Sequence, residues 1–372
     1  MKKNIKLSAA IATIGIFLAA SIYELHSQNS LNNALNVYGF TKPDQKKALN
    51  DLFHQAGVIL QRRSYSIPSF FEQNQNLLAS DILHLVKMTQ CTFTIRKGTQ
   101  ERWETRPLEW MLKNKEQILY DLKILGFVRA IKPKIKNPDA VCILGATRKR
   151  MATRIGYVEQ LISHGLSTDH VILLAGERYV SANIDATEKE LTDIAKGFNL
   201  SDWRKLTETH LMKELYNSSF LSKNGIPVSI IDTPRGLLPR PTTQTTIVSL
   251  IQWLKDQPHL KNIVFVSNQP NVHYQDAIIK TVFHENGMNI NFEVVGPAAE
   301  DECEIKSILE GLGSYIWAAL PNVLSSLKLK ITDNTIKEEF RELYSGNPLI
   351  YENLPENLKA MNYDNEHRFH SS

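Results

Sequence analysis

The sequence is poor in cysteine and lacks the short motifs that mark the common metal and nucleotide sites. Its three cysteines, Cys91, Cys142 and Cys303, stand far apart, so they form neither a metal-ligand spacing nor a disulfide framework. No Gly-x-Gly-x-x-Gly, no Walker lysine motif and no His-Glu-x-x-His occurs in the chain. We therefore expect no bound metal ion, and the sequence leaves the cofactor unknown. Cys142 lies in an apolar stretch and is expected in the core, whereas a disulfide between Cys91 and Cys303 stays open.

Charge is neither abundant nor concentrated. Charged residues make up 22% of the 372 residues, and the formal net charge is only +4. A nucleic-acid-binding protein needs a clustered basic face, so this composition predicts no nucleic-acid partner. Hydrophobic residues make up 42% of the chain, which is enough for one large core or two moderate ones.

Only one apolar run approaches the length of a membrane span, and it lies at the N-terminus. Lys2, Lys3 and Lys6 precede an uncharged stretch from Leu7 to Tyr23. This order is typical of a secretory signal or a signal-anchor, so we expect membrane contact through residues 5–23. The basic flank predicts that the rest of the chain is periplasmic or otherwise extracytoplasmic. It would be anchored to the inner membrane if the segment is retained and secreted if the segment is cleaved.

The chain is predicted to fall into five parts that differ in composition. A polar spacer (24–43) follows the N-terminal segment (1–23), and a helical region (44–138) shows apolar residues at helical spacing. An α/β domain (139–320) and a polar C-terminal extension (321–372) complete the chain. No internal repeat and no low-complexity tract occurs in the sequence.

Short apolar segments that each end in polar residues alternate with amphipathic stretches in the predicted α/β domain. This alternation predicts an α/β fold with a Rossmann-like, mostly parallel sheet and flanking crossover helices. The predicted strands cover 140–144, 171–175, 228–231, 263–266 and 292–295. Helices are predicted near 149–164, 187–196, 203–222, 243–256, 272–286 and 301–319. Because such sheets bind ligands outside the carboxyl ends of their strands, the functional site is expected at that edge.

The first predicted strand leads through Gly145-Ala-Thr147-Arg148 into a basic helix. A strand-to-helix turn presents free backbone N–H groups and the positive end of the helix, and arginine adds bidentate donors. The arrangement predicts that Gly145, Thr147 and Arg148 bind an anionic small molecule. An ordinary turn before a solvated helix is the alternative interpretation.

The second and third strand ends add charged and hydroxyl side chains. Glu177 is a candidate general base, or else pairs with a neighbouring arginine, and Asp232 is a second candidate acid or base. Either Thr242 or Thr243 is a natural helix N-cap, and hydroxyls at a helix start also suit a phosphate. The predicted ligand-binding residues at these ends are Gly176, Arg178, Arg235, Arg240, Thr242 and Thr243.

The fourth strand end is rich in uncharged hydrogen-bonding groups. Ser267, Asn268 and Gln269 follow the strand as predicted ligand contacts, and His273 comes shortly after them. A serine and a histidine on one loop suggest a nucleophile and its base, which makes His273 the third catalytic candidate. No Gly-x-Ser-x-Gly elbow surrounds Ser267, so a loop that orients a ligand, or a simple capped turn, is the alternative.

Taken together, the strand ends resemble those of the YdcF-like family, the domain of unknown function 218 that includes SanA and ElyC. Ile143-Leu-Gly145 and Leu173-Leu-Ala-Gly176 are similar to the first two strand ends of that family. The segment from Asp232 to Thr246 takes the place of its acidic, threonine-rich part, and Val264-Phe-Val-Ser267 with His273 that of its fourth strand end. The chain departs from the family in lacking a glycine pair after the second strand and an arginine after His273.

The resemblance implies a membrane-associated protein of cell-envelope biogenesis. Its ligand would be a phosphorylated or nucleotide-like small molecule, or an envelope precursor, held at the carboxyl ends of the strands. If the protein is an enzyme, hydrolysis or transfer at a phosphate or glycosidic centre is the expected reaction class, with arginines that stabilise charge. A non-catalytic binding or assembly module and a secreted factor are the alternatives.

Overall fold

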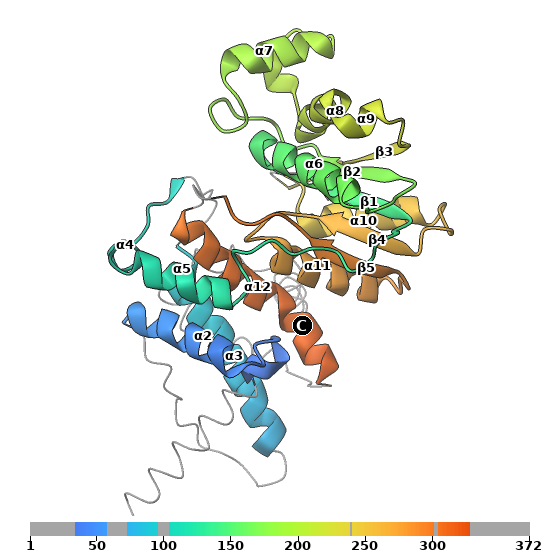
Figure 1. Ribbon diagram of the computed structural model, residues 1–372. Helices are drawn as coiled ribbons and strands as arrows, with labels where there is room; N and C mark the ends of the chain where they lie inside the picture. The colour runs from blue at the N-terminus through green and yellow to red at the C-terminus, as the bar shows by residue number, and fades with distance from the viewer. Residues whose placement is uncertain (1–33, 58–72, 96–103, 239, 301–303, 328–372) are drawn as a thin grey trace, which may run out of the picture. The chain divides into compact units, whose positions relative to one another are not determined.

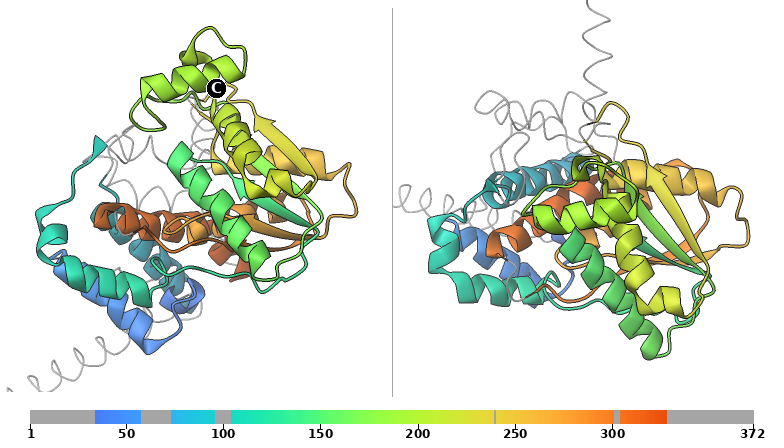
Figure 2. Two further views of the ribbon diagram at one scale, coloured as in Figure 1. Left: turned by 45° about the horizontal axis from the view of Figure 1, so that its top comes forward. Right: turned by 90° about the horizontal axis from the view of Figure 1, so that it is seen from above.

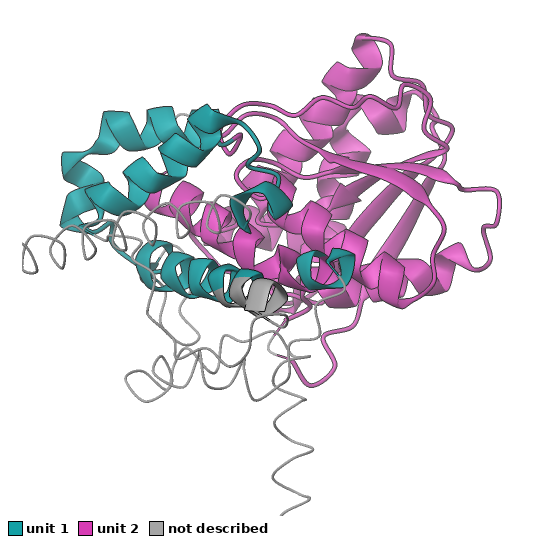
Figure 3. Cartoon of the chain, turned by 90° about the horizontal axis from the view of Figure 1, so that it is seen from below, with its two compact units in different colours: residues 1–125, 323–372 teal, residues 126–322 magenta. Residues whose placement is uncertain are grey.

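The computed structural model of the protein describes residues 34–57, 73–95, 104–238, 240–300 and 304–327. The chain divides into two compact units, residues 1–125 with 323–372 (unit 1) and residues 126–322 (unit 2), which Figure 3 distinguishes by colour. The predicted N-terminal signal or anchor lies outside the described residues, as does most of the predicted C-terminal extension.

No helix in the described ranges combines the length and the apolar character that crossing a membrane requires.

The described helices of unit 1 lie in the region predicted to be helical. Pro43 occupies the first turn of its helix, where the fixed φ of proline suits a helix start and the missing N–H is not needed. Phe53 and Phe93 are buried, and their rings stack with centroids 4.8 Å apart, so they join the first two of these helices. The helices are α2 (Pro43–Gln55), α3 (Gln73–Phe93), α4 (Glu109–Lys113) and α5 (Lys115–Ile124).

Unit 2 is built on a five-stranded sheet in which every strand pairing is parallel. The strand order is β3-β2-β1-β4-β5. The prediction of an α/β fold with a mostly parallel sheet and flanking helices is therefore confirmed. The strands are β1 (Ala140–Leu144), β2 (Val171–Gly176), β3 (Val228–Thr233), β4 (Asn262–Val266) and β5 (Asn291–Val295).

Helices cover both faces of the sheet (Figures 1 and 2). Alternate residues of β1 explain this layering, because Val141 and Ile143 pack on one side while Ala140 and Cys142 pack on the other. Cys142 is thus a buried core residue, as predicted. The first face is covered by α6 (Arg148–Ser163) and α8 (Glu208–Ser218), and the second by α10 (Thr243–Leu254) and α11 (Val272–Glu285).

The predicted helix over 203–222 is wrong as a single element. The chain forms a 3-10 turn, η2 (Trp203–Lys205), then α8, then α9 (Phe220–Lys223). Thr207 and Ser219 interrupt it, because both adopt extended backbone and act as N-caps of the helices that follow. The break has a functional consequence, since it places Glu208 at the start of α8.

Two other helices complete unit 2 and the end of the described chain. Thr187 is the N-cap of α7 (Glu188–Gly197), and its hydroxyl accepts a hydrogen bond from the backbone N–H of Glu190. The last helix, α12 (Ile305–Ser326), starts in unit 2, contains Pro321 and runs beyond its predicted end near residue 319.

The strand order creates a topological switch point between β1 and β4. After β3 the chain returns to the other side of β1, so the connections that leave β1 and β4 diverge to opposite faces. In sheets wound in this way the crevice at the switch point, outside the carboxyl ends of the strands, is where ligands bind. A ligand-binding site is therefore expected among the residues that follow β1 and β4.

Candidate functional site

The turn after β1 begins at a glycine that a carboxylate overlies. Gly145 continues the sheet ladder through a 2.7 Å hydrogen bond from its N–H to the carbonyl of Leu174. A Cβ at this position would collide with Oε1 of Glu208. Thr147 is the N-cap of α6, but its hydroxyl makes no capping hydrogen bond. The turn thus leaves room for a carboxylate-sized group beside an incompletely capped helix start.

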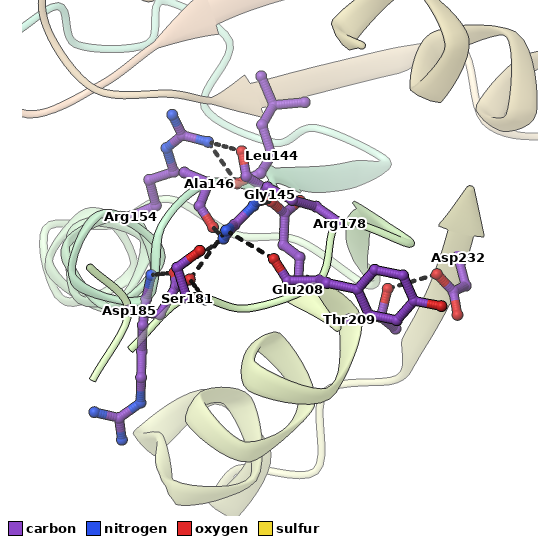
Figure 4. A network of polar contacts seen from close by, with 12 residues as sticks. Leu144, Gly145, Ala146, Arg154, Arg178, Ser181, Asp185, Glu208, Thr209 and Asp232 are labelled. Atoms are coloured by element: carbon purple, nitrogen blue, oxygen red, sulfur yellow. Dashed lines mark hydrogen bonds and ion pairs between the residues drawn. The ribbon is translucent and has the colours of Figure 1, made fainter. Parts of the chain in front are cut away.

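A buried ion cluster stands next to this turn (Figure 4). The Arg178 guanidinium donates from Nη1 and Nη2 to the two carboxylate oxygens of Asp185, at 3.0 and 2.9 Å, and from Nε to Oε2 of Glu208 at 2.9 Å. A further hydrogen bond from Nη2 reaches the carbonyl of Ala146 at 3.1 Å. The end of β2, the segment before α7 and the start of α8 are therefore fastened to one arginine.

The two carboxylates of this cluster differ in how firmly they are held. Asp185 also accepts the backbone N–H groups of Arg148 and Ser181, at 3.1 and 3.0 Å. Burial alone would raise the pKa of Asp185, but hydrogen bonds and the charge of Arg178 outweigh it and lower that pKa. For Glu208 burial is the larger effect, so its pKa is raised although Arg178 and Arg154 oppose the change.

Arg154 joins the ends of β1 and β4, and Figure 4 shows its contacts with the end of β1. Its side chain leaves α6 and donates from Nη1 to the carbonyls of Leu144 and Gly145, at 2.6 and 2.7 Å. Its Nε and Nη2 donate to Oδ1 of Asn268, which follows β4, at 3.0 and 2.7 Å. The residue is only 2% exposed, and burial, aided by the nearby charge of Arg150, lowers its pKa to about 9. All of these acceptors are neutral, so within the described ranges no carboxylate bonds this buried cation directly.

Two of the predicted ligand-binding arginines are engaged inside the protein. Arg148 reaches Oε2 of Glu214 at 3.1 Å, and Arg178 is held by Asp185 and Glu208. Glu177 pairs with neither arginine, because its Oε2 accepts the backbone N–H of Arg235 at 3.1 Å. The structure thus brings Gly145, Thr147, Arg148 and Arg178 together at the ends of β1 and β2, while Glu177 faces the loop after β3.

The third strand end is organised around hydroxyl groups. Asp232 accepts a 2.6 Å hydrogen bond from Oγ1 of Thr209, the second residue of α8. Thr242, rather than Thr243, is the N-cap of α10, and its hydroxyl accepts from the backbone N–H of Thr245 at 3.2 Å. Thr243 is therefore the first residue of α10, and exposed Arg240 precedes the cap.

The loop between Asp232 and α10 approaches the end of β2. A Cβ on Gly176 would collide with the ring of Pro241 and the carbonyl of Thr233. The guanidinium of Arg235 lies over the ring of Tyr179, with Cζ 5.4 Å from the centroid. Gly176 and Arg235 thus hold this loop in place at the strand ends.

The residues that follow β4 are buried. Ser267, Asn268 and Gln269 are all buried, and Ser267 is fully so. Gln269 donates from Nε2 to the carbonyls of Gly126 and Arg129, at 2.8 and 3.0 Å. Asn268 receives Arg154, and Gln269 holds the loop before β1. Ser267 instead donates hydrogen bonds to the carbonyls of Val295 and Asn268.

His273 is buried beside the same loop. Its Nε2 lies 3.1 Å from the carbonyl of Gly126, and its ring packs against Phe127 and Tyr315. Burial lowers the pKa of His273, although the contact with Gly126 opposes that shift. Ser267 and His273 share no hydrogen bond within the described part of the chain, and the hydroxyl of Ser267 is directed to the carbonyl of Asn268.

Sequence reasoning missed the residues that define the cluster, namely Asp185, Glu208 and the role of Arg154. Asp185 stands in a segment typical of a helix start, and Glu208 follows a threonine cap as an ordinary acidic residue of a first helical turn. The sequence did contain one indication of the role of Arg154. Arg150 and Arg154 have the i, i+4 spacing that places two like charges on one helix face.

The described residues contain no group of three or more histidine, cysteine, aspartate or glutamate side chains placed to hold a metal ion. Cys91 and Cys142 are both free thiols, and Cys303 lies outside the described residues. No protein-family model matches the chain, and no curated protein matches it either.

Proposed function

We propose that unit 2 binds an anionic small molecule at the carboxyl end of β1, between the start of α6 and Glu208. The observation that carries the proposal is the pair of arginines on α6. Among the described residues buried Arg154 has only neutral acceptors, and Arg150 stands one turn before it, nearer the start of the helix. Two guanidinium groups on one helix face repel each other, so an anion beside them would offset that repulsion.

The start of α6 supports the same ligand class. The hydroxyl of Thr147 does not cap the helix, and among the described residues no acceptor bonds the backbone N–H of Arg150. The backbone N–H groups at the start of α6 carry the positive end of the helix dipole, which favours binding of phosphate or carboxylate groups. Asp185 already accepts the N–H of Arg148, so the protein itself places one oxyanion at this helix start.

We further propose that the chain is a divergent YdcF-like protein of the cell envelope, which limits the classes of ligand to be expected. A phosphorylated or nucleotide-like molecule, or an envelope precursor, carries the oxyanion that the arginines and helix start would hold. Residues 5–23 would anchor the protein in the inner membrane, with the remainder extracytoplasmic, or would be cleaved to release a secreted form.

A binding function without catalysis is the second candidate, and the fourth strand end favours it. A serine nucleophile needs its base within hydrogen-bond reach and must be open to the substrate. Ser267 is 0% exposed, and His273 is directed at the carbonyl of Gly126. If chemistry does occur, the partly exposed Glu208 is better placed beside Arg154 and Arg178 than His273 is.

Titration of the full chain tests the proposal, with inorganic phosphate, a nucleoside triphosphate and a sugar nucleotide as probes. We expect at least one probe to raise the melting temperature, because a ligand that binds only the folded state stabilises it. Arg150→Gln should weaken that probe roughly tenfold, which is typical of a charged hydrogen bond of about 1.5 kcal/mol. Lys280→Gln on α11 removes the same charge from an exposed position on the other face and should leave affinity unchanged. Equal loss in both variants, or no binding by any probe, would contradict the proposal.

A further inference from the structure

We infer that Glu208 is an internal occupant of the proposed anion site, and that an incoming oxyanion displaces it as its carboxylate takes up a proton from solvent. The inference rests on the anion site proposed above and adds a mechanism to it. The only bonds that change are those of one proton, which leaves hydronium or a buffer acid and forms an O–H bond on Glu208, while the ligand keeps its charge. Anion affinity is then linked to protonation of a single side chain.

The hydrogen bonds of the cluster identify which carboxylate can leave. Each oxygen of Asp185 accepts two hydrogen bonds, from Arg178 together with a backbone N–H, and its side chain is 0% exposed. Glu208 accepts one hydrogen bond, from Arg178 to Oε2, and its side chain is 12% exposed. Within the described residues Oε1 accepts no hydrogen bond and lies over Gly145. Asp185 is therefore fixed, while Glu208 can be exchanged for another oxyanion.

The space that Glu208 occupies suits a small oxyanion. It exists only because residue 145 has no Cβ, and Arg178 and Arg154 stand beside it. A phosphate, sulfate or carboxylate group presents the same acceptor oxygens to a guanidinium as Glu208 does. The ligand class is thus a small oxyanion, free or attached to a larger molecule that extends out of the site.

The charges around Glu208 favour its protonation when an anion enters. The charged groups that face Glu208 are Arg178 from the end of β2, Asp185 from the segment before α7 and Arg154 from α6. With Glu208 ionised the two positive and two negative groups balance. An added anion would leave excess negative charge in a poorly solvated place, which is costly. Protonation of Glu208 removes one of these negative charges, and burial has already raised the pKa of Glu208.

The test uses sulfate as the probe, because sulfate keeps the same charge between about pH 5.5 and pH 8. Calorimetric titration of the full chain should show affinity falling as pH rises, by up to about tenfold per pH unit above the pKa of Glu208. Repeating the titration in buffers with different ionisation enthalpies should show uptake of close to one proton. Glu208→Gln should bind sulfate with little pH dependence and without proton uptake. Glu214→Gln, which removes the partner of Arg148, should keep the pH dependence of the natural chain.

Each outcome bears on a distinct claim. Sulfate binding that is independent of pH and takes up no proton overturns the role of Glu208 and leaves the anion site intact. The same pH dependence in Glu208→Gln also overturns that role, because another group must then take up the proton. Absence of sulfate binding in both the natural chain and Glu208→Gln overturns the anion site itself. The proton count is measured on the natural chain, so the test stands even if a variant fails to fold.

Discussion

Arg178 is the residue on which the strand-end cluster depends, because it holds two carboxylates from separate segments of the chain. Its bond to Asp185 is the firmer one, because Nη1 and Nη2 each donate to a different carboxylate oxygen of Asp185. Such a pair stabilises a fold only while both partners are present, since removing one leaves a buried charge unpaired. Single substitutions here should therefore have large and unequal effects.

Asp185→Asn should lower the free energy of unfolding by about 3–5 kcal/mol at neutral pH, the usual cost of breaking a buried pair. Because the folded state lowers the pKa of Asp185, its contribution is present above the unfolded pKa of about 3.9 and is lost as pH falls through the folded pKa. The difference between the natural chain and the variant should thus shrink in acid. Urea unfolding at about pH 7 and about pH 3 measures it.

Asp193→Asn is the matched control for that experiment. Asp193 forms an exposed pair with Lys196 on α7, and exposed pairs contribute little to stability. Its loss should leave the unfolding midpoint unchanged at both pH values. A variant at Asp185 that is as stable as this control would show that the cluster contributes nothing to the fold.

Gly145→Ala tests the contact between the turn and Glu208. The new methyl group would collide with Oε1, so the variant should lose about 1–3 kcal/mol, the usual cost of overpacking. Combining it with Glu208→Ala removes the collision, and the double variant should be more stable than the sum of the two single changes predicts. Denaturant unfolding of all four proteins gives the coupling energy. Strict additivity would mean that the two residues do not touch.

At the scale of elements, the central strands β1 and β2 could be predicted because they are parallel and buried. Every residue of β1 and β2 is buried, so each appears in the sequence as a continuous apolar run between polar segments. The prediction of a single helix over 203–222 was wrong because the hydrophobic pattern does not show where the helices end. Its apolar spacing continues through Thr207 and Ser219, and only their capping geometry ends the helices.

The cluster itself could not be predicted from the sequence. Glu208 contacts Arg178, 30 positions away in the sequence, and lies over Gly145, which is farther still, so no local spacing indicates these contacts. The strand-end rule indicated the edge of the sheet where this cluster lies, with Gly145, Arg148 and Arg178 among its residues. The rule could not predict which of the charged side chains at this edge form ion pairs within the protein.

Thr242→Ala tests the start of α10. Loss of the hydroxyl that accepts the N–H of Thr245 should lower the free energy of unfolding by about 1 kcal/mol, the typical value of an N-cap. Thr243→Ala, one position later, removes a hydroxyl that does not cap the helix and should have little effect. Thermal unfolding of the two variants compares them directly. Equal effects would show that the cap adds nothing at this position.

At the scale of the whole molecule, the proposal of an envelope protein depends on residues 1–23, which the structure does not describe. We predict that the full chain, expressed in a Gram-negative bacterium, enters the membrane fraction and is digested by protease added to spheroplasts. A variant without residues 1–23 should remain in the cytoplasm and be protected. Recovery of the full chain in the cytoplasm would contradict the proposed localisation.

Diffraction from a crystal of the full chain soaked in selenate tests the central claim most directly. Selenate has the shape and charge of sulfate, and the anomalous signal of selenium locates it without ambiguity. We predict a selenate ion at the carboxyl end of β1, within hydrogen-bond distance of the Arg154 or Arg178 guanidinium, with Glu208 moved away from Gly145. Selenate bound only at surface arginines such as Arg235, with Glu208 still over Gly145, would contradict an anion site at this edge of the sheet.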